Sequence, residues 1–383
     1  MAAIARALIL EAVKSVTRPI PNPDTLVLPF FAGRERSCEA SSELSAAITL
    51  PTRPLRSMML PRLEKREGEI MKNGAMLGAL LAAGCVILPL SSASADIRVN
   101  GSRIHPESIT ADAAGNIYTG SVPGTIYRAK PGSDTAEPWI VPSAANGLTS
   151  QLGVLVDDAR GVLLVCNNPP FGGPPQSGAK SSLKAFDLKT GELKASHDFP
   201  TGGPIICNDI AVDRGGTTFA TDTSGGRIFA LAPGGSELTV FAADPELVGI
   251  DGIAFAADGA MYINNVRKNT VQRVNRKGGG AYEGLTTLTL SEPVNGPDAL
   301  RPVSGNRFLQ AEGPGNRVTY VDIEGDRAII TPIKTGLDSS PGVTHIGNTG
   351  YATEGKINYL FDPALKEKSP DPFFIRSFPL SGQ

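Results

Sequence analysis

After residue 100 the chain repeats one short pattern six times, and this repeat restricts the fold more than any other feature. Each copy has an apolar alternating run, a glycine-rich turn and a second run of β-forming residues. Successive copies are 43 to 56 residues apart when they are aligned on the residue that opens the first run. Repeats of this length with four short strands each are typical of propeller blades. The opening residues are Glu107, Leu152, Asn208, Asp251, Asp298 and Pro341.

The composition also indicates an all-β chain. No window has a convincing helical period, and the 43 Gly and 31 Pro residues disfavour helices. We therefore expect a six-bladed β-propeller with four-stranded blades around a central channel. A strand from one end of the domain should complete a blade begun at the other end, because sheet edges otherwise stay open. Residues 97–104 and 373–378 are available for this, and 356–361 is the expected third run of the sixth copy.

The first 95 residues do not belong to the repeat. A charged start at Met71, an apolar stretch (75–90) and small residues ending at Ala95 have the organisation of a secretory signal peptide. A membrane anchor is the first alternative, but a span needs about twenty residues; a lipid anchor at Cys85 is the weaker one. We predict three parts: 1–70, a disordered extension from an overextended gene model; 71–95, the signal peptide; and 96–383, the propeller domain.

Export would place the mature chain in the periplasm or outside the cell, where disulfides form. Cys166 and Cys207 are the two cysteines of the propeller domain, and their strands are expected in adjacent blades. A disulfide between them is one interpretation. Two buried thiols that pack as small apolar groups are an equally good one.

Four opening residues carry side-chain oxygens: Glu107, Asn208, Asp251 and Asp298. The first strand of each propeller blade begins near the axis, so these side chains should converge. Three carboxylates in one place repel each other by several kcal/mol at an effective dielectric of about 20, and a divalent cation would remove this repulsion. Oxygen ligands favour Ca²⁺, while Mg²⁺, Mn²⁺ and Zn²⁺ stay open. The competing interpretation is that Asp and Asn before glycine are ordinary turn formers.

The residues around these positions resemble the blade openings of one known family, which comprises senescence marker protein 30, gluconolactonases and related lactonases. The resemblance covers about residues 103–362 and rests on the shared phase of four short motifs. These are Pro106-Glu107-Ser108, Cys207-Asn208-Asp209-Ile210, Ile250-Asp251-Gly252-Ile253 and Gly296-Pro297-Asp298-Ala299. It implies a six-bladed propeller with an axial divalent metal, commonly Ca²⁺, and the hydrolysis of lactones.

Carried over residue by residue, the resemblance implies that Glu107, Asn208 and Asp298 are metal ligands. Asp251 stands where the family usually has a second Asn, which adds a negative charge. The metal would polarise the lactone carbonyl, and Asp298 would activate water as general base. Ile206 stands where sugar-lactone members commonly have an Arg that contacts substrate hydroxyls, so we expect a more apolar lactone or ester.

Second strands return to the same face of a propeller, so polar residues at their ends are candidates for the rim of the site. His345 is a candidate proton shuttle in the channel, although a channel histidine with structural partners is the simpler interpretation. The candidate substrate-binding residues are Asn167, Asp222, Asn265, Glu312, His345 and Glu354. The insertion at 168–180 is expected to be a loop over the channel mouth.

We therefore expect a metal-dependent hydrolase with a small-molecule substrate. A net charge of −2 offers no electrostatic reason to bind nucleic acid, and after removal of the signal no membrane association is expected. The first alternative is a non-catalytic propeller that binds a ligand or a protein and keeps a structural metal, because one fold hosts many functions. A condensing enzyme similar to strictosidine synthase is disfavoured, because such enzymes lack the full set of metal ligands.

Overall fold

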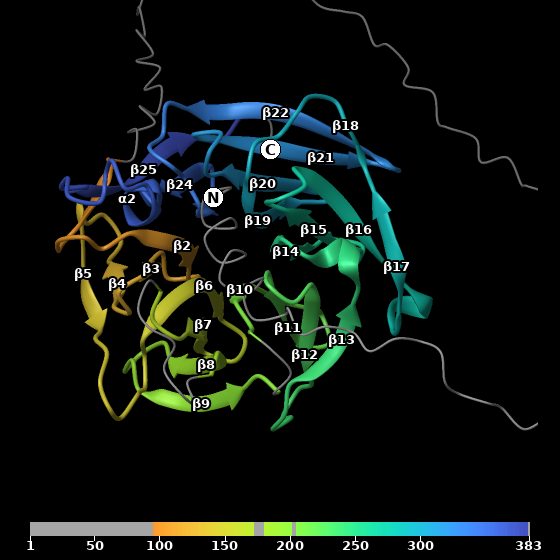
Figure 1. Cartoon of the computed structure of the whole chain (residues 1–383), viewed down its shortest axis with the longest axis horizontal. Helices are drawn as coiled ribbons and strands as arrows, with labels where there is room; N and C mark the ends of the chain where they lie inside the picture. Colours follow the sequence, from red (N-terminus) through yellow and green to blue (C-terminus); the bar gives the residue numbers. More distant parts are fainter. Residues whose placement is uncertain (1–94, 172–179, 201–203, 382–383) are drawn as a thin grey trace, which may run out of the picture. The chain divides into compact units, whose positions relative to one another are not determined.

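The computed structural model describes residues 95–171, 180–200 and 204–381, and in these residues nearly all regular structure is β-strand. Figure 1 shows the strands grouped into sheets that lie around a common centre. The all-β class is confirmed. The described helices fall short of the length and apolar character needed to span a bilayer. The predictions for residues 1–94 and for most of the 168–180 loop lie outside the described residues.

Most sheets follow the chain order, because short turns join neighbouring antiparallel strands. The first set has β2 (Pro106–Ala111), β3 (Ile117–Ser121), β4 (Ile126–Ala129) and β5 (Thr135–Ile140), and the second has β6 (Ser150–Asp157), β7 (Val162–Asn168), β8 (Ser182–Asp187) and β9 (Leu193–Asp198). The third has β10 (Cys207–Val212), β11 (Thr218–Asp222), β12 (Arg227–Leu231) and β13 (Thr239–Ala243), and the fourth has β14 (Ile250–Phe255), β15 (Met261–Asn265), β16 (Thr270–Arg276) and β17 (Tyr282–Thr287). The fifth has β19 (Pro297–Ser304), β20 (Arg307–Glu312), β21 (Arg317–Glu324) and β22 (Arg327–Thr335), with β18 (Thr289–Leu290) added beside β22.

The sixth set combines strands from both ends of the domain, as expected. It contains β23 (Val343–Ile346), β24 (Thr349–Thr353), β25 (Phe373–Pro379) and β1 (Ile97–Val99), and β1 pairs antiparallel with β25. β1 also pairs with β5 in parallel over two residue pairs, which joins the first and sixth sets into one eight-stranded sheet. The N-terminal strand therefore covers an edge that β25 would otherwise leave open.

The third strand predicted at 356–361 is wrong. Lys356 has a φ of 47°, outside the extended region, and the following residues form the short helix α2 (Asn358–Phe361). An extended strand cannot continue through a left-handed residue, so the chain turns away from β24. The later segment β25 takes the place beside β24 instead.

The first strands share a β-bulge that the alignment of repeats did not predict. In β2, β6, β10, β14 and β19 the pairing register shifts at the opening residue of the repeat and the residue after it. A bulge bends a strand and re-aims a side chain, and bulges are frequent next to active sites. The same irregularity, repeated in five sets, therefore gives the opening side chains a common orientation.

Glycine follows the opening residue in the second, fourth and sixth copies, where another first strand lies very close. A Cβ added to Gly252 would lie 2.3 Å from the backbone oxygen of Asp298, and one added to Gly153 would lie 2.1 Å from that of Asn208. Real Cβ atoms do not approach a backbone oxygen so closely. Glycine at these positions therefore allows adjacent first strands to approach each other.

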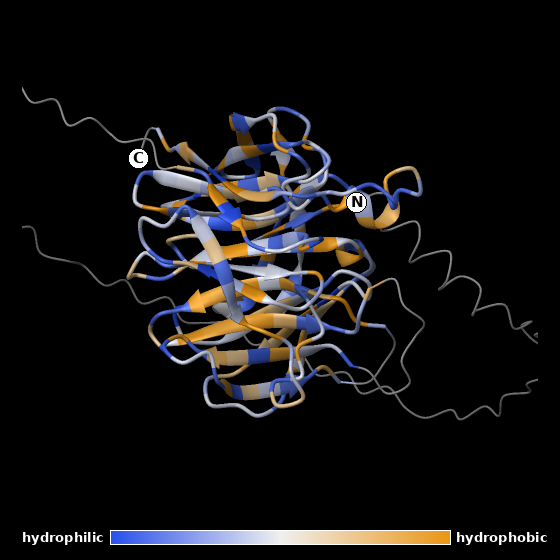
Figure 2. Ribbon diagram, turned by 90° about the vertical axis from the view of Figure 1, so that its left-hand side faces the viewer, coloured by the Kyte–Doolittle hydropathy of each residue, from blue (hydrophilic) through white to orange (hydrophobic). Residues whose placement is uncertain are grey.

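Apolar side chains hold neighbouring strand sets face to face. Tyr118 and Ile126 of the first set, for example, pack in one cluster with Val154 and Leu163 of the second. Figure 2 shows hydrophobic and hydrophilic segments alternating along the strands, as expected for half-buried β-structure. Burial of these faces fixes the first strands beside one another and so positions the site.

Candidate active site

The four predicted metal ligands meet at one place between the first strands. Glu107 comes from β2, Asn208 from β10, Asp251 from β14 and Asp298 from β19, and all four line one small cavity. Each is the first residue of the bulge in its strand. Their side chains are between 1% and 7% exposed, so the group is nearly withdrawn from water.

Direct contacts link these side chains. The Asp251 carboxyl lies within hydrogen-bonding distance of the side chains of Asp298 and Asn208. The Asn208 amide also donates to the Thr223 hydroxyl (2.9 Å), which in turn donates to the backbone oxygen of Ile250 (2.7 Å). Asn208 is therefore oriented by a neighbouring strand, as a preorganised site requires.

Burial and like charge make these carboxyls weak acids. Burial raises the pKa of Asp251 to about 8, and the nearby Asp209 carboxylate acts in the same direction. The pKa of Asp298 is raised by burial and then by the charges of Asp251 and Glu107. Burial and the charge of Asp251 also raise the pKa of Glu107. Without a positive charge among them, burial and mutual repulsion therefore favour the protonated form of these carboxyls.

The donor chemistry fits a hard cation. The Oδ2 atoms of Asp251 and Asp298 are buried and have no hydrogen-bond partner among the described residues. Unpartnered buried carboxyl oxygens are costly, and a set made only of oxygens suits Ca²⁺ or Mg²⁺. In the described part of the chain no group of three or more His, Cys, Asp or Glu residues is already arranged to hold a metal. The observation in favour of a metal site is therefore the convergence of these side-chain oxygens.

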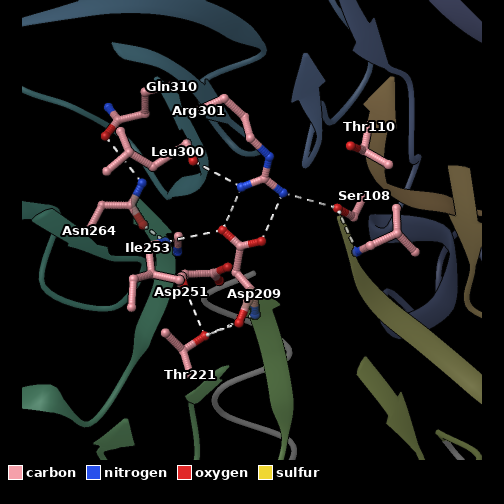
Figure 3. Close-up of polar contacts among 12 residues, drawn as sticks. Ser108, Thr110, Asp209, Thr221, Asp251, Ile253, Asn264, Leu300, Arg301 and Gln310 are labelled. Carbon is pink, nitrogen blue, oxygen red and sulfur yellow. Dashed lines mark hydrogen bonds and ion pairs between the residues drawn. The ribbon is translucent and has the colours of Figure 1, made fainter. Parts of the chain in front are cut away.

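A buried ion pair beneath the carboxyls was not predicted from the sequence. Figure 3 shows the Arg301 guanidinium holding both oxygens of Asp209, at 2.7 and 2.8 Å. The Nη1 atom of Arg301 also donates to the backbone oxygen of Leu300 (2.9 Å), and its Nη2 atom lies 3.4 Å from the Ser108 hydroxyl. Asp209 and Arg301 are 3% and 5% exposed. This bidentate pair ties β10 to β19 below the site.

The aligned repeats contain a feature that points to this ion pair. Three residues after the opening residue the six copies read Thr110, Leu155, Ala211, Ala254, Arg301 and Thr344. Arg301 is the only charged residue at this phase, where the strand faces the centre. A charge at an otherwise small or apolar position needs a buried partner, and Asp209 is the acidic residue of β10 next to Asn208.

Second strands support the bulges from behind. The Thr221 hydroxyl accepts from the backbone nitrogen of Asp209 (2.9 Å) and donates to the backbone oxygen of Asp251 (2.9 Å), as Figure 3 shows. The Asn264 side chain likewise accepts from the backbone nitrogen of Gly252 (2.8 Å). These polar residues satisfy backbone groups that the bulge removes from the ladder. Thr221 and Asn264 thus hold the bulges in place, although neither side chain lines the small cavity.

A larger cavity, here called the apolar cavity, opens on one side of the carboxyls. It encloses about 690 Å³ of space including its mouth, and Glu107, Asn208 and Asp251 line it. Asp298 does not line the apolar cavity; it lines the small cavity. Other lining residues are Val122, Leu152, Phe171, Ile206, Thr223, Val266, Arg267, Pro341, Ile357, Leu360 and Phe361. The lining is mostly apolar, as the sequence indicated at Ile206.

The structure places the predicted rim residues away from this cavity. Each has partners in its own strand set, and none of the six lines the apolar cavity. Asp222, for example, accepts from the backbone nitrogen of Ile206 (3.0 Å) and forms an ion pair with Arg227 (2.6 Å). Carboxylates and amides at strand ends commonly hold the following turn in this way. The contacts of the others are as follows: Asn167 accepts from Thr149, Asn265 from Arg267 and Lys268, Glu312 from Asn295 and Arg317, and Glu354 pairs with Arg376.

His345 also lies outside the candidate site. Its ring nitrogens face the backbone oxygens of Pro302 (3.2 Å) and Gly347 (3.3 Å). It belongs to β23, beyond the opening residue Pro341, so the strand carries it away from the carboxyls. The geometry therefore agrees with the simpler interpretation, a histidine with structural partners.

Cys166 and Cys207 form a disulfide, with Cα atoms 5.2 Å apart. It joins β7 to β10 at the residue before Asn208. Asn168 adds two hydrogen bonds to the backbone of Cys207, one in each direction (both 2.9 Å). Of the two interpretations left open by the sequence, the structure has the disulfide.

Comparison with known proteins adds one local match. The profile of the family described as strictosidine synthase-like, N-terminal, matches residues 93–129. This segment covers β1 to β4 and includes Glu107, but none of the other three predicted ligands. No curated protein sequence matches the chain.

Solved structures with similar folds carry different names. A gluconolactonase from Xanthomonas campestris has a TM-score of 0.52 and 14% identity, over 76% of this chain and 99% of that one. The major allergen Mala s 1 of Malassezia sympodialis has a TM-score of 0.56 and 14% identity, over 74% and 95% of the two chains. A luciferin-regenerating enzyme has a TM-score of 0.52 and 12% identity, over 73% and 93%. At the level of the fold, these findings confirm the resemblance of this chain to the family of senescence marker protein 30, gluconolactonases and related lactonases.

Proposed function

We propose that this chain is a metal-dependent hydrolase of a lactone or related ester, built on a closed six-bladed propeller. Closure is supported by contacts between successive first strands, β2 with β6, β6 with β10, and so on to β23, which contacts β2. The observation that carries the function is the group of buried carboxyls beside the apolar cavity, with unpartnered oxygens on Asp251 and Asp298. Three acidic side chains are not kept in such a place for packing.

Glu107, Asn208, Asp251 and Asp298 would hold the cation. Ca²⁺ suits four oxygen donors best, and Mg²⁺ or Mn²⁺ would also accept them. When bound, the cation would polarise the substrate carbonyl as a Lewis acid. The Cys166–Cys207 disulfide supports a periplasmic or secreted location, because such bonds persist in oxidising compartments.

The residues of the chain would supply the remaining steps. Asp298 would take a proton from water as the water oxygen bonds to the carbonyl carbon, and that proton would pass to the leaving oxygen as the carbon–oxygen bond breaks. The product is a hydroxy acid, or an acid and an alcohol. The apolar lining around Ile206 and Leu152 would exclude bulk water and favour substrates with few hydroxyls.

One observation favours the second candidate, a non-catalytic binding propeller with a structural metal. Asp298 does not line the apolar cavity, so as the structure stands the assigned base does not face the space for a substrate. The shared fold does not decide between the two, because the similar structures include an allergen as well as enzymes. The two candidates therefore need a direct test.

The test is a panel of lactones and esters followed by pH-stat titration, with and without chelator. Asp298→Asn removes the proposed base, and Asp258→Asn is the matched control, because Asp258 is an exposed turn residue between β14 and β15. We expect turnover of apolar lactones by the wild type and the control. Chelator and Asp298→Asn should each reduce it at least about a hundredfold.

Two results would change the proposal. Calcium binding in a calorimeter without turnover of any member of the panel would favour the binding propeller. Turnover that survives both the chelator and Asp298→Asn would remove the mechanism.

A further inference from the structure

Among the described residues that line the apolar cavity, Arg267 is the single cation. It lies in the turn between β15 and β16, and its backbone nitrogen donates to the Asn265 side chain (3.1 Å). A Cβ on Gly249 would lie 2.8 Å from both Cβ and Cγ of Arg267. The stem of this side chain is thus held against the neighbouring turn.

Among the described residues the guanidinium has no hydrogen-bond or ion-pair partner. Its Nε is buried without a hydrogen bond, and within the described residues Arg267 forms no ion pair. The two internal segments outside the description, residues 172–179 and 201–203, contain no Asp or Glu. The next residue behaves differently, since Lys268 pairs with the Glu246 carboxylate at 2.7 Å.

The cost of this arrangement is visible in the acid–base behaviour of the side chain. Burial lowers the pKa of Arg267, and no neighbouring carboxylate opposes the shift. Glu107 and Asp251 line the same cavity, but neither forms an ion pair with Arg267 among the described residues. Arg267 is only partly exposed, and withdrawing part of a guanidinium from water without a counter-charge is unfavourable.

The space in front of Arg267 is apolar. The other residues that line the cavity are mostly aliphatic or aromatic, among them Leu152, Ile206, Leu360 and Phe361. A ligand that fills this space needs an apolar body, and it meets one positive charge near the wall. Pockets with mostly apolar linings commonly fix their ligands through a few polar groups of this kind.

We propose that Arg267 is a specificity-determining residue that binds the carboxylate of an amphiphilic substrate, whose apolar body fills the cavity. This inference rests on the proposed hydrolase and names its substrate class: an apolar lactone or ester that also carries one free carboxylate. A planar guanidinium can hold a carboxylate through two hydrogen bonds. A single negative charge matches the single cation, whereas a phosphate dianion would add charge close to Glu107 and Asp251.

The first arm of the test measures equilibrium binding and does not depend on turnover. Octanoate and the uncharged octanamide of the same length are titrated into the calcium-saturated wild type by calorimetry at neutral pH. We expect octanoate to bind at least about tenfold more tightly than octanamide, with the difference shrinking as salt is added. Equal affinities, or no binding of octanoate, would overturn the inference.

The second arm uses Arg267→Met, which keeps the stem, and Lys268→Gln, which removes the adjacent but paired charge. Arg267→Met should abolish the preference for octanoate without lowering the melting temperature, because the side chain has no partner to lose. Lys268→Gln should keep the preference within about twofold. A preference that survives Arg267→Met would also overturn the inference.

Turnover then separates this inference from the proposed function. If no ester or lactone is hydrolysed, the hydrolase fails while the binding preference still tests Arg267. If neutral lactones are hydrolysed and acidic ones are not preferred, the hydrolase stands and the inference fails. Where both hold, Arg267→Met should raise KM for the acidic substrates and leave kcat nearly unchanged, as loss of uniform binding requires.

Discussion

The buried Asp209–Arg301 pair provides the most informative perturbation of this fold. Arg301→Met removes both hydrogen bonds from the guanidinium, at 2.7 and 2.8 Å, and leaves Asp209 with the backbone nitrogen of Ile253 at 3.1 Å. Removing one partner of a buried pair typically costs about 3–5 kcal/mol, because the other charge stays buried and uncompensated. For a domain of this size that loss corresponds to a fall in melting temperature of about 5–8 °C.

The variant should also affect the carboxyls above the pair. The positive charge of Arg301 lowers the pKa values of Glu107 and Asp251, which burial raises. Without Arg301 both groups should hold their protons to still higher pH. We therefore expect weaker calcium binding in Arg301→Met than in the wild type, measured by calorimetry.

Two variants test whether the uncompensated charge is the cause. The double variant Asp209→Asn with Arg301→Met removes both charges and should recover at least half of the lost stability in urea denaturation. Arg307→Met is the matched control, because its pair with Asp322 is more than a quarter exposed, and it should cost about 1 kcal/mol or less. A loss of less than about 1 kcal/mol in Arg301→Met, or a double variant no more stable than the single one, would refute the reasoning.

Three further predictions concern the close approach of the first strands, the carboxyls and the disulfide. Gly252→Ala places a Cβ 2.3 Å from the backbone oxygen of Asp298, so it should cost about 1–3 kcal/mol in urea denaturation, and an unchanged midpoint would argue against that contact. In chelator, the melting temperature should fall as pH rises from about 4 to 8: the folded pKa of Asp251, about 8, lies above its ordinary value of 3.8, so the folded state holds a proton that the unfolded state has released. Calcium should reduce this fall, and a melting temperature that rises with pH in chelator would contradict the assignment. Replacing Cys166 and Cys207 by Ala should cost about 2–4 kcal/mol, measured against the oxidised wild type; equal stability would show that the bond constrains little.

Much of the architecture could be predicted because it depends on local patterns that recur. The alternation of apolar residues and the glycine turns predicted an all-β chain of short strands, and the described residues confirm this class. The failure at 356–361 has a local cause, the left-handed backbone at Lys356, which no apolar pattern reveals. The predicted rim residues show another gap: Asp222 and its counterparts contact turn backbones and arginines, and sequence spacing does not indicate which way a strand-end side chain points.

The sequence by itself determined that six similar β-units would place Glu107, Asn208, Asp251 and Asp298 at one phase, because a repeat assigns equivalent residues to equivalent positions. Only the tertiary structure decided how these side chains are oriented and which residues surround them. The bulges re-aim the opening side chains, and the packing of neighbouring sheets brings together residues that lie about ninety positions apart in the chain, as in the Asp209–Arg301 pair. Such pairings depend on distances across the centre of the fold, and a pattern read along the chain contains no information about those distances.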